Sequence, residues 1–269
     1  MGRNRALTLV LAAAWLSGAA ALADWEVNID AGERAYHKGD RVEAEKYLQA
    51  ALKEAEVFGD RDERLAATLN DMGVIYDETK RFAEGEAVYK RALAIRENLR
   101  GPDHVDVATS CNNLANLYKD TGKYDQAESL YKRAIAIYTR PGKASDLTAM
   151  GYSNLAHLYE KQGREKQALA MYEKALADAD KVLGPSNPHT VDLVSSVALG
   201  YEKEGRNAEA LPLFRRYLTS VATLFKLSMD DPRTMPRLKE IAGKMRKDGL
   251  AANADLVEKA IAIVGAPAE

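Results

Sequence analysis

The sequence repeats itself at an almost constant interval, and this repetition constrains the fold more than any other feature. Residues 112–138 form the clearest copy, and weaker copies precede and follow them. A small residue, here called the anchor, marks the middle of a first helix in each copy. The anchors are 41, 42, 41 and 42 residues apart, at Gly32, Gly73, Ala115, Ala156 and Ala198. A unit of this size cannot bury its apolar face alone, so the repeat predicts an all-α chain of stacked helical hairpins.

The residue types that follow each anchor describe a helix, a turn and a second helix. In the clearest copy these residues are Tyr118, Gly122 and Ala127. Small residues allow two helices to cross closely, and a large side chain beside the crossing fills the remaining space. Glycine is expected where the chain reverses, because that position usually needs a positive φ. We therefore predict a positive φ at Gly122, Gly163 and Gly205.

This order of small, aromatic and glycine positions resembles the tetratricopeptide repeat, whose usual period is about 34 residues. The longer spacing here, with the segments NNLANLY, YKRALAI and GPDHVDVATS, is similar to the subclass found in kinesin light chains. One departure is Gly85, which replaces the usual alanine of the second helix. The resemblance implies an all-α, right-handed solenoid of about six antiparallel helical hairpins over residues 24–264. The implied repeats span about residues 25–60, 65–101, 104–140, 147–184, 189–228 and 231–264, before a tail at 265–269.

Two junctions contain residues that are typical of helix N-caps. The turn at residues 101–103 ends in Asp103, and Asp231 precedes Pro232 at the start of a degenerate sixth copy. An aspartate side chain can accept a hydrogen bond from the first turn of a helix, and proline is favoured at the first helical position. We therefore predict N-caps at Asp103 and Asp231.

Residues 1–23 have the pattern of a cleaved signal peptide. A short basic end is followed by an apolar stretch and by a small-x-small cleavage site that ends at Ala23. We expect cleavage after Ala23 and a periplasmic or secreted mature protein that starts at Asp24. The alternative is an uncleaved membrane anchor, because residues 6–23 contain only two polar side chains.

Composition limits the kinds of partner. Removal of residues 1–23 takes away two of the 38 basic residues and none of the 40 acidic ones, which leaves a net charge of −4. An acidic chain of this kind is a poor match for nucleic acid, so we expect no nucleic-acid partner. Cys111 is the single cysteine, so no intramolecular disulfide can form. We expect it to be a small, buried apolar residue.

The sequence offers little support for catalysis. The four histidines fall in different copies, and no two have the spacing of a metal site. The sequence contains neither a glycine-rich nucleotide-binding motif nor a nucleophile elbow. Carboxylates are spread over helix surfaces in i,i+4 pairs such as Glu86 with Lys90. We therefore expect no enzyme, no metal and no cofactor, and keep a periplasmic enzyme or a small-ligand-binding protein as an alternative.

A row of amide and other polar side chains recurs at fixed positions relative to the anchors. These positions lie three and two residues before the anchor and one residue after it, on the face of the first helix opposite its apolar stripe. An amide can both donate and accept, so it can pair with the main chain of an extended ligand. The alternative is that some of these amides bridge adjacent helices. The candidate groove residues are Asn70, Asn112, Asn113, Asn116, Asn154, His157 and Ser196.

The repeat, the resemblance and the polar row together predict a non-catalytic scaffold that binds a protein or a peptide segment. In the family that the chain resembles, the concave groove holds the peptide. A structural or assembly component of a cell-envelope complex, bound through the stack ends or the convex face, is the other alternative. The protein is expected at a membrane only if the N-terminal segment is uncleaved.

Overall fold

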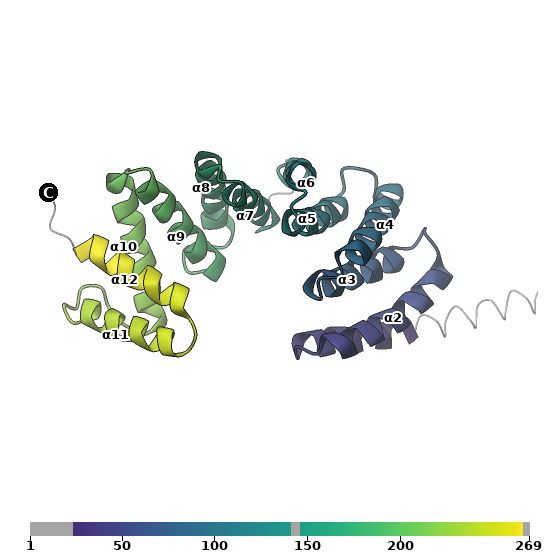
Figure 1. Cartoon of the computed structure of the whole chain (residues 1–269), viewed down its shortest axis with the longest axis horizontal. Coiled ribbons are helices and arrows are strands. Elements are labelled where there is room, and N and C mark those ends of the chain that lie inside the picture. The colour runs from purple at the N-terminus through teal and green to yellow at the C-terminus, as the bar shows by residue number, and fades with distance from the viewer. Residues whose placement is uncertain (1–23, 141–145, 266–269) are drawn as a thin grey trace, which may run out of the picture. The chain divides into compact units, whose positions relative to one another are not determined.

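The computed structural model describes residues 24–140 and 146–265, and every regular element within them is an α-helix. The predicted signal peptide and residues 266–269 of the predicted tail lie outside the described residues. The chain divides into two compact units, one that ends at Arg140 and one that begins after it. Each unit contains three helical hairpins (Figure 1). The predicted all-α solenoid of six hairpins is thereby confirmed.

In the first unit, the second helix of each hairpin packs against the first helix of the next, α2 on α3 and α4 on α5. The first hairpin pairs residues 24–37 with α2 (Arg41–Phe58). The other two pair α3 (Glu63–Glu78) with α4 (Phe82–Arg100), and α5 (Val105–Asp120) with α6 (Tyr124–Tyr138).

The second unit also contains three hairpins, in which α8 packs on α9. The hairpins pair α7 (Asp146–Lys161) with α8 (Glu165–Val182), α9 (Pro188–Lys203) with α10 (Asn207–Leu224), and α11 (Thr234–Lys247) with α12 (Ala251–Gly265).

The turn inside every hairpin has one geometry. The residue seven positions after each anchor has a positive φ, as does Gly249, which stands at the same distance from Ala242 in the sixth hairpin. The predicted positive φ at Gly122, Gly163 and Gly205 is confirmed, with values of 76°, 70° and 74°. The next residue donates its N–H to a carbonyl five positions earlier, as Lys123 does to Tyr118 at 2.8 Å. This is the Schellman arrangement, which satisfies carbonyls at the end of the first helix and reverses the chain.

The same turns carry a cation over an aromatic ring. The basic residue after the turn lies 5.1 Å from the ring centroid in the Lys123–Tyr118 pair and 4.1 Å in the Arg164–Tyr159 pair. Arg81 on Tyr76 and Arg206 on Tyr201 repeat the contact. Each pair stabilises the start of the second helix, which has no side-chain cap in these four hairpins.

Small residues occupy the helix crossings, as predicted. Ala115, Ala156 and Ala127 are fully buried. In the second hairpin the crossing is tighter, because a Cβ added at Gly73 would lie 2.4 Å from the Tyr89 ring. A Cβ at Gly85 would lie 2.8 Å from a methyl carbon of Leu117. The departure from alanine at Gly85 therefore follows from packing against α5.

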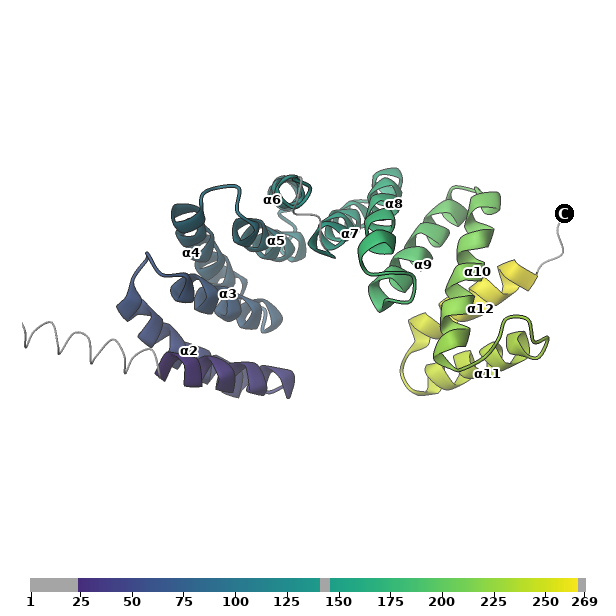
Figure 2. The same ribbon diagram turned by 180° about the vertical axis from the view of Figure 1, so that it is seen from behind.

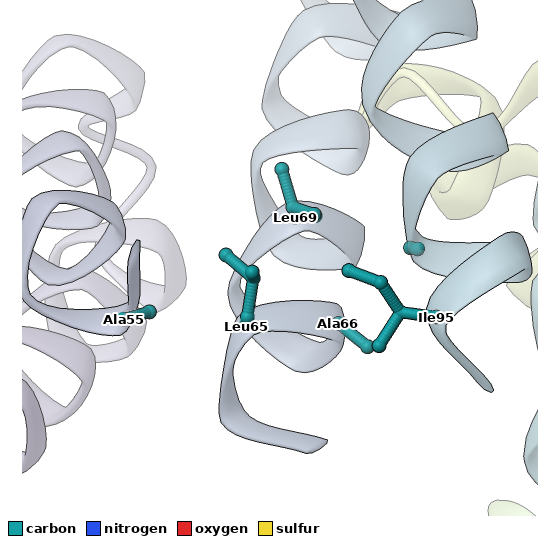
Figure 3. Packing of buried hydrophobic residues seen from close by; sticks show 6 residues of the cluster. Ala55, Leu65, Ala66, Leu69 and Ile95 are labelled. Carbon is teal, nitrogen blue, oxygen red and sulfur yellow. The ribbon is translucent and has the colours of Figure 1, made fainter. Parts of the chain in front are cut away.

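Apolar side chains from three helices form the core at the start of the first unit. Ala55 of α2 faces Leu65 of α3, and on the other side of α3 Ala66 packs near Ile95 of α4 (Figure 3). Partly buried side chains, Trp25 among them, close the edge of this cluster. The cluster joins the first hairpin to the second, as the stacking of repeats requires.

The last hairpin packs differently from the others. Its second helix, α12, is the one that packs on α10, and it crosses α10 in both views (Figures 1 and 2). Lys259 of α12 also forms an ion pair with Glu202 of α9 at 2.6 Å. The reason lies in composition: six of the 14 residues of α11 are charged, against three of the 15 residues of α12.

Two predicted N-caps were wrong. The N-cap of α5 is His104, whose Nδ1 accepts from the N–H of Asp106 at 3.2 Å, whereas Asp103 forms an ion pair with Arg140. The helix α11 begins at Thr234 and its N-cap is Arg233, so Asp231 lies two residues before the capping position. Its carboxylate accepts instead from the N–H of Arg233.

The turn geometry yields a stability prediction within the second unit. Gly205→Ala should lower the free energy of unfolding by about 1–2 kcal/mol, because a side chain is disfavoured at positive φ. No atom lies within 4 Å of the added Cβ, so packing does not contribute. The control Gly243→Ala, equally uncrowded but inside α11, should instead raise it by about 0.5–1 kcal/mol. Urea unfolding of both variants checks this, and shifts of the same sign would contradict it.

Candidate functional site

In the first unit the predicted groove residues lie on α3 and α5 and are half-buried. Asn113 donates from Nδ2 to Oδ1 of Asn70 at 2.7 Å, which joins α5 to α3. The Tyr131 hydroxyl donates to Oδ1 of Asn116 at 2.5 Å, which joins α6 to α5. Asn112, which also lies on α5, takes part in an interaction as well. These contacts are those of the bridging alternative.

In the second unit the predicted residues lie around a cleft between the first helices α7 and α9. Asn154 and His157 come from α7, and Ser196 comes from α9. The cleft has a volume of about 690 Å³, within the range of typical ligand sites. Its lining residues are Asp146, Met150, Ser153, Asn154, His157, Leu183, Asn187, His189, Asp192, Leu193 and Ser196.

Local contacts orient several of these side chains. Asn187 caps α9 by accepting from the N–H of His189 at 2.9 Å. The Ser196 hydroxyl donates to the main-chain carbonyl of Asp192 at 3.0 Å. The His157 ring meets the Tyr172 ring edge-on, with 5.4 Å between centroids. Contacts within α9, and one between α7 and α8, therefore fix the orientation of these polar groups.

The cleft combines apolar surface with a polar atom that has no hydrogen-bond partner in the part of the chain that the structure describes. Met150 is a large apolar side chain that is 43% exposed, and Leu193, which is almost completely buried, belongs to the facing wall. Nε2 of His189 is buried and has no hydrogen-bond partner among the described residues. A buried nitrogen without a partner reduces the stability of the fold.

The candidate groove residues include only three of the eleven lining residues, and Asp146, Met150, His189 and Asp192 are among those that sequence reasoning missed. A signal for them exists in the spacing, because each lies three or four residues from another member of the wall, as in 146–150–154 and 189–192–196. Extending the polar row by one or two turns toward the start of each first helix would have included them.

Among the described residues, no three histidine, cysteine, aspartate or glutamate side chains are grouped so that they could hold a metal ion. Cys111 is buried, and burial raises the pKa of its thiol to about 11, so the reactive thiolate is scarce at neutral pH. No helix in the described ranges has both the length and the apolar character needed to cross a bilayer.

Carboxylates lie beside the bridging amides in the first unit. Asp71 is next to Asn70, and burial raises the pKa of the Asp71 carboxyl to about 6 against the opposing effect of a hydrogen bond from Asn70. Asp77 lies two turns beyond Asn70, and burial, aided by Asp120, raises its pKa as well. Oδ1 of Asp77 is buried without a partner among the described residues. The charged forms of both groups therefore reduce the stability of the fold.

This pKa shift yields a pH-dependent prediction. The folded-state pKa of Asp71 lies above the unfolded value of about 3.9, so its penalty is absent below pH 4, grows up to about pH 6 and then stays constant. Asp71→Asn should therefore stabilise the protein by about 1–3 kcal/mol at pH 7.5 and hardly at all at pH 4. Chemical denaturation across this pH range checks it. Asp30→Asn, at an exposed position of the same unit, should show no such rise, and a gain for Asp71→Asn that does not vary with pH would contradict the assignment.

Comparison with known proteins identifies the repeat type. The model of the tetratricopeptide repeat family matches residues 78–140 and 147–221, which is just over half of the chain. No curated protein sequence matches the chain.

Solved structures share the fold. A kinesin light chain-like protein from Podosopora anserina with nearly identical TPR-like repeats is 19% identical, with a TM-score of 0.63 over 75% of this chain and 96% of that one. BtubC (BKLC) from P. vanneervenii is 24% identical, with a TM-score of 0.64 over 82% and 95%. The Rap conjugation gene regulator of plasmid pLS20, in complex with the Phr* peptide, is 16% identical, with a TM-score of 0.59 over 90% and 74%. At these identities the likeness concerns the fold alone.

Proposed function

The chain belongs to the tetratricopeptide repeat family, with repeats like those of kinesin light chains, and we propose that it is a non-catalytic scaffold that binds a protein or peptide segment. The observation that carries the proposal is the cleft between α7 and α9. This cleft is lined by Asn154 and His157 from one hairpin and by Ser196 from the next.

The cleft is better suited to binding an extended peptide segment than to catalysing a reaction. Amide, hydroxyl and imidazole groups along its walls can pair with main-chain N–H and C=O groups whatever the side chains of the ligand. Apolar surface at Met150 supplies a place for one side chain of the segment. The similar Rap regulator carries a peptide in its solved structure, which supports the same use of this fold here.

The proposal is tested on capture of the native partner by an Asn154→Ala/His157→Ala variant. Each lost hydrogen bond contributes about 0.5–1.5 kcal/mol net, so the double change should weaken capture roughly five- to a hundredfold. Gln126→Ala, an exposed amide on the second helix α6, is the matched control and should leave capture unchanged. Pull-down from the native host, with thermal melts on all variants, is the measurement.

Two results would overturn this placement of the site. Undiminished capture with an unchanged melt would favour a component of a cell-envelope complex that is bound through the stack ends or the convex face. A collapsed melt would show that Asn154 and His157 are bridges between helices, like Asn113 in the first unit.

The proposed scaffold acts outside the cytoplasm. The basic end, apolar stretch and small-x-small site of residues 1–23 support export. N-terminal sequencing of the protein from its host should begin at Asp24, in a periplasmic or secreted fraction. Recovery of intact Met1 from a membrane fraction would instead establish an uncleaved anchor.

A further inference from the structure

We infer that the cleft between α7 and α9 selects a peptide segment in which a lysine or arginine stands next to a large apolar side chain. The inference rests on the proposed function, because it names the chemistry of the segment that the same cleft takes. It is carried by the apolar patch inside the cleft and by the charges around it.

The preference for a large apolar side chain in the ligand comes from one part of the cleft wall. Met150 of α7 is exposed although it is large and apolar, and Leu183 and Leu193 line the cleft with it. Burial of such surface by a ligand side chain is favourable in proportion to its area. Methionine also adapts its shape to different partners, so leucine, methionine or phenylalanine can each occupy this position.

The preference for a lysine or arginine in the ligand comes from two carboxylates on opposite walls of the cleft. Asp146 stands on α7 and Asp192 on α9, and both are exposed to solvent. Neither forms an ion pair with another described residue, and no lysine or arginine is among the residues that line the cleft. A cationic side chain that enters between these helices is therefore attracted from both sides, without displacing a cation of the protein.

A smaller hollow, lined by α7, α8 and α9, adjoins the cleft and has the same sign of net charge. The two share His157 and Ser196 on their walls, and the hollow adds Glu160, Glu165 and Lys203. Lys203 is its only basic side chain, and an ion pair with Glu165 at 3.4 Å already offsets that charge. With Glu165 and Lys203 paired, Glu160 leaves the hollow with a net negative charge. An extended segment that runs from the cleft into the hollow therefore meets negative charge on both sides of its apolar side chain, which suits basic neighbours.

An anionic segment is the competing occupant, since helices α7 and α9 both begin at the cleft. The positive end of α9 is already engaged, because Asn187 accepts from its N–H at His189. Asp146 is the first residue of α7 and brings a full negative charge to the other helix end. A full charge outweighs the half charge of a helix terminus, so the cation is favoured.

A random heptapeptide library displayed on phage, selected on the full-length protein, tests the inference. Wild-type protein should enrich sequences with lysine or arginine beside leucine, methionine or phenylalanine. For a synthetic copy of an enriched peptide, Asp146→Asn/Asp192→Asn should weaken binding roughly five- to thirtyfold while the apolar preference stays. Asp230→Asn/Asp248→Asn removes the same charge from exposed positions of the same unit and should change binding less than twofold.

A cleft-filling variant separates this inference from the proposed function. Ser196→Trp should abolish enrichment, and His157→Trp, at a more exposed position, replaces it if the first variant fails to fold by circular dichroism. Enriched peptides that are neutral or acidic, or that bind the doubly neutralised variant as well as wild type, overturn the inference and leave the proposed function standing. Absence of enrichment over the filled variant overturns both.

Discussion

The reversal between the two helices of each hairpin is the constraint on which the rest of the structure depends. In every hairpin the residue seven positions after the anchor has a positive φ, and the next N–H closes onto the end of the first helix. Five of these positions hold glycine, and Lys80 holds the sixth at a φ of 63°. Because a side chain is disfavoured there, the conformation at Lys80 shows that the rest of the hairpin imposes the turn.

Because the turn is fixed, it determines which face of each first helix the second helix covers and which face it leaves uncovered. The anchor and the aromatic residue three positions later face the second helix, so the polar row lies on another side. In the second unit the remaining faces of α7 and α9 border a cleft. In the first unit those of α3 and α5 are joined through Asn70 and Asn113. One repeat pattern thus produces an open site where serine and histidine replace asparagine, and a bridge where two amides meet.

Sequence reasoning recovered what depends on single hairpins. The spacing, the turn glycines and the small residues at crossings follow from local geometry, and the structure confirms them at Gly122 and Ala127. It failed where the outcome depends on two elements at once. The cap at Asp103 was lost to an ion pair with Arg140, and the docking of α12 depends on how little apolar surface α11 offers. The cleft residues Met150 and Asp192 belong to different helices, so no single stretch of sequence shows them as neighbours.

The groups whose burial reduces stability are concentrated on the first helices. The four buried side-chain atoms without a hydrogen-bond partner in the described residues belong to α3 and α9, and Asp77 and His189 are among their owners. Ion pairs form on both sets of helices, such as Glu63 of α3 with Arg96 and Glu86 of α4 with Lys123, but no such unpaired atom belongs to a second helix in the described residues. Departures from local rules are more common at functional sites than elsewhere in a fold. The two first helices of the proposed cleft fit this tendency, because α9 carries the unpaired Nε2 of His189 and α7 carries the exposed Met150.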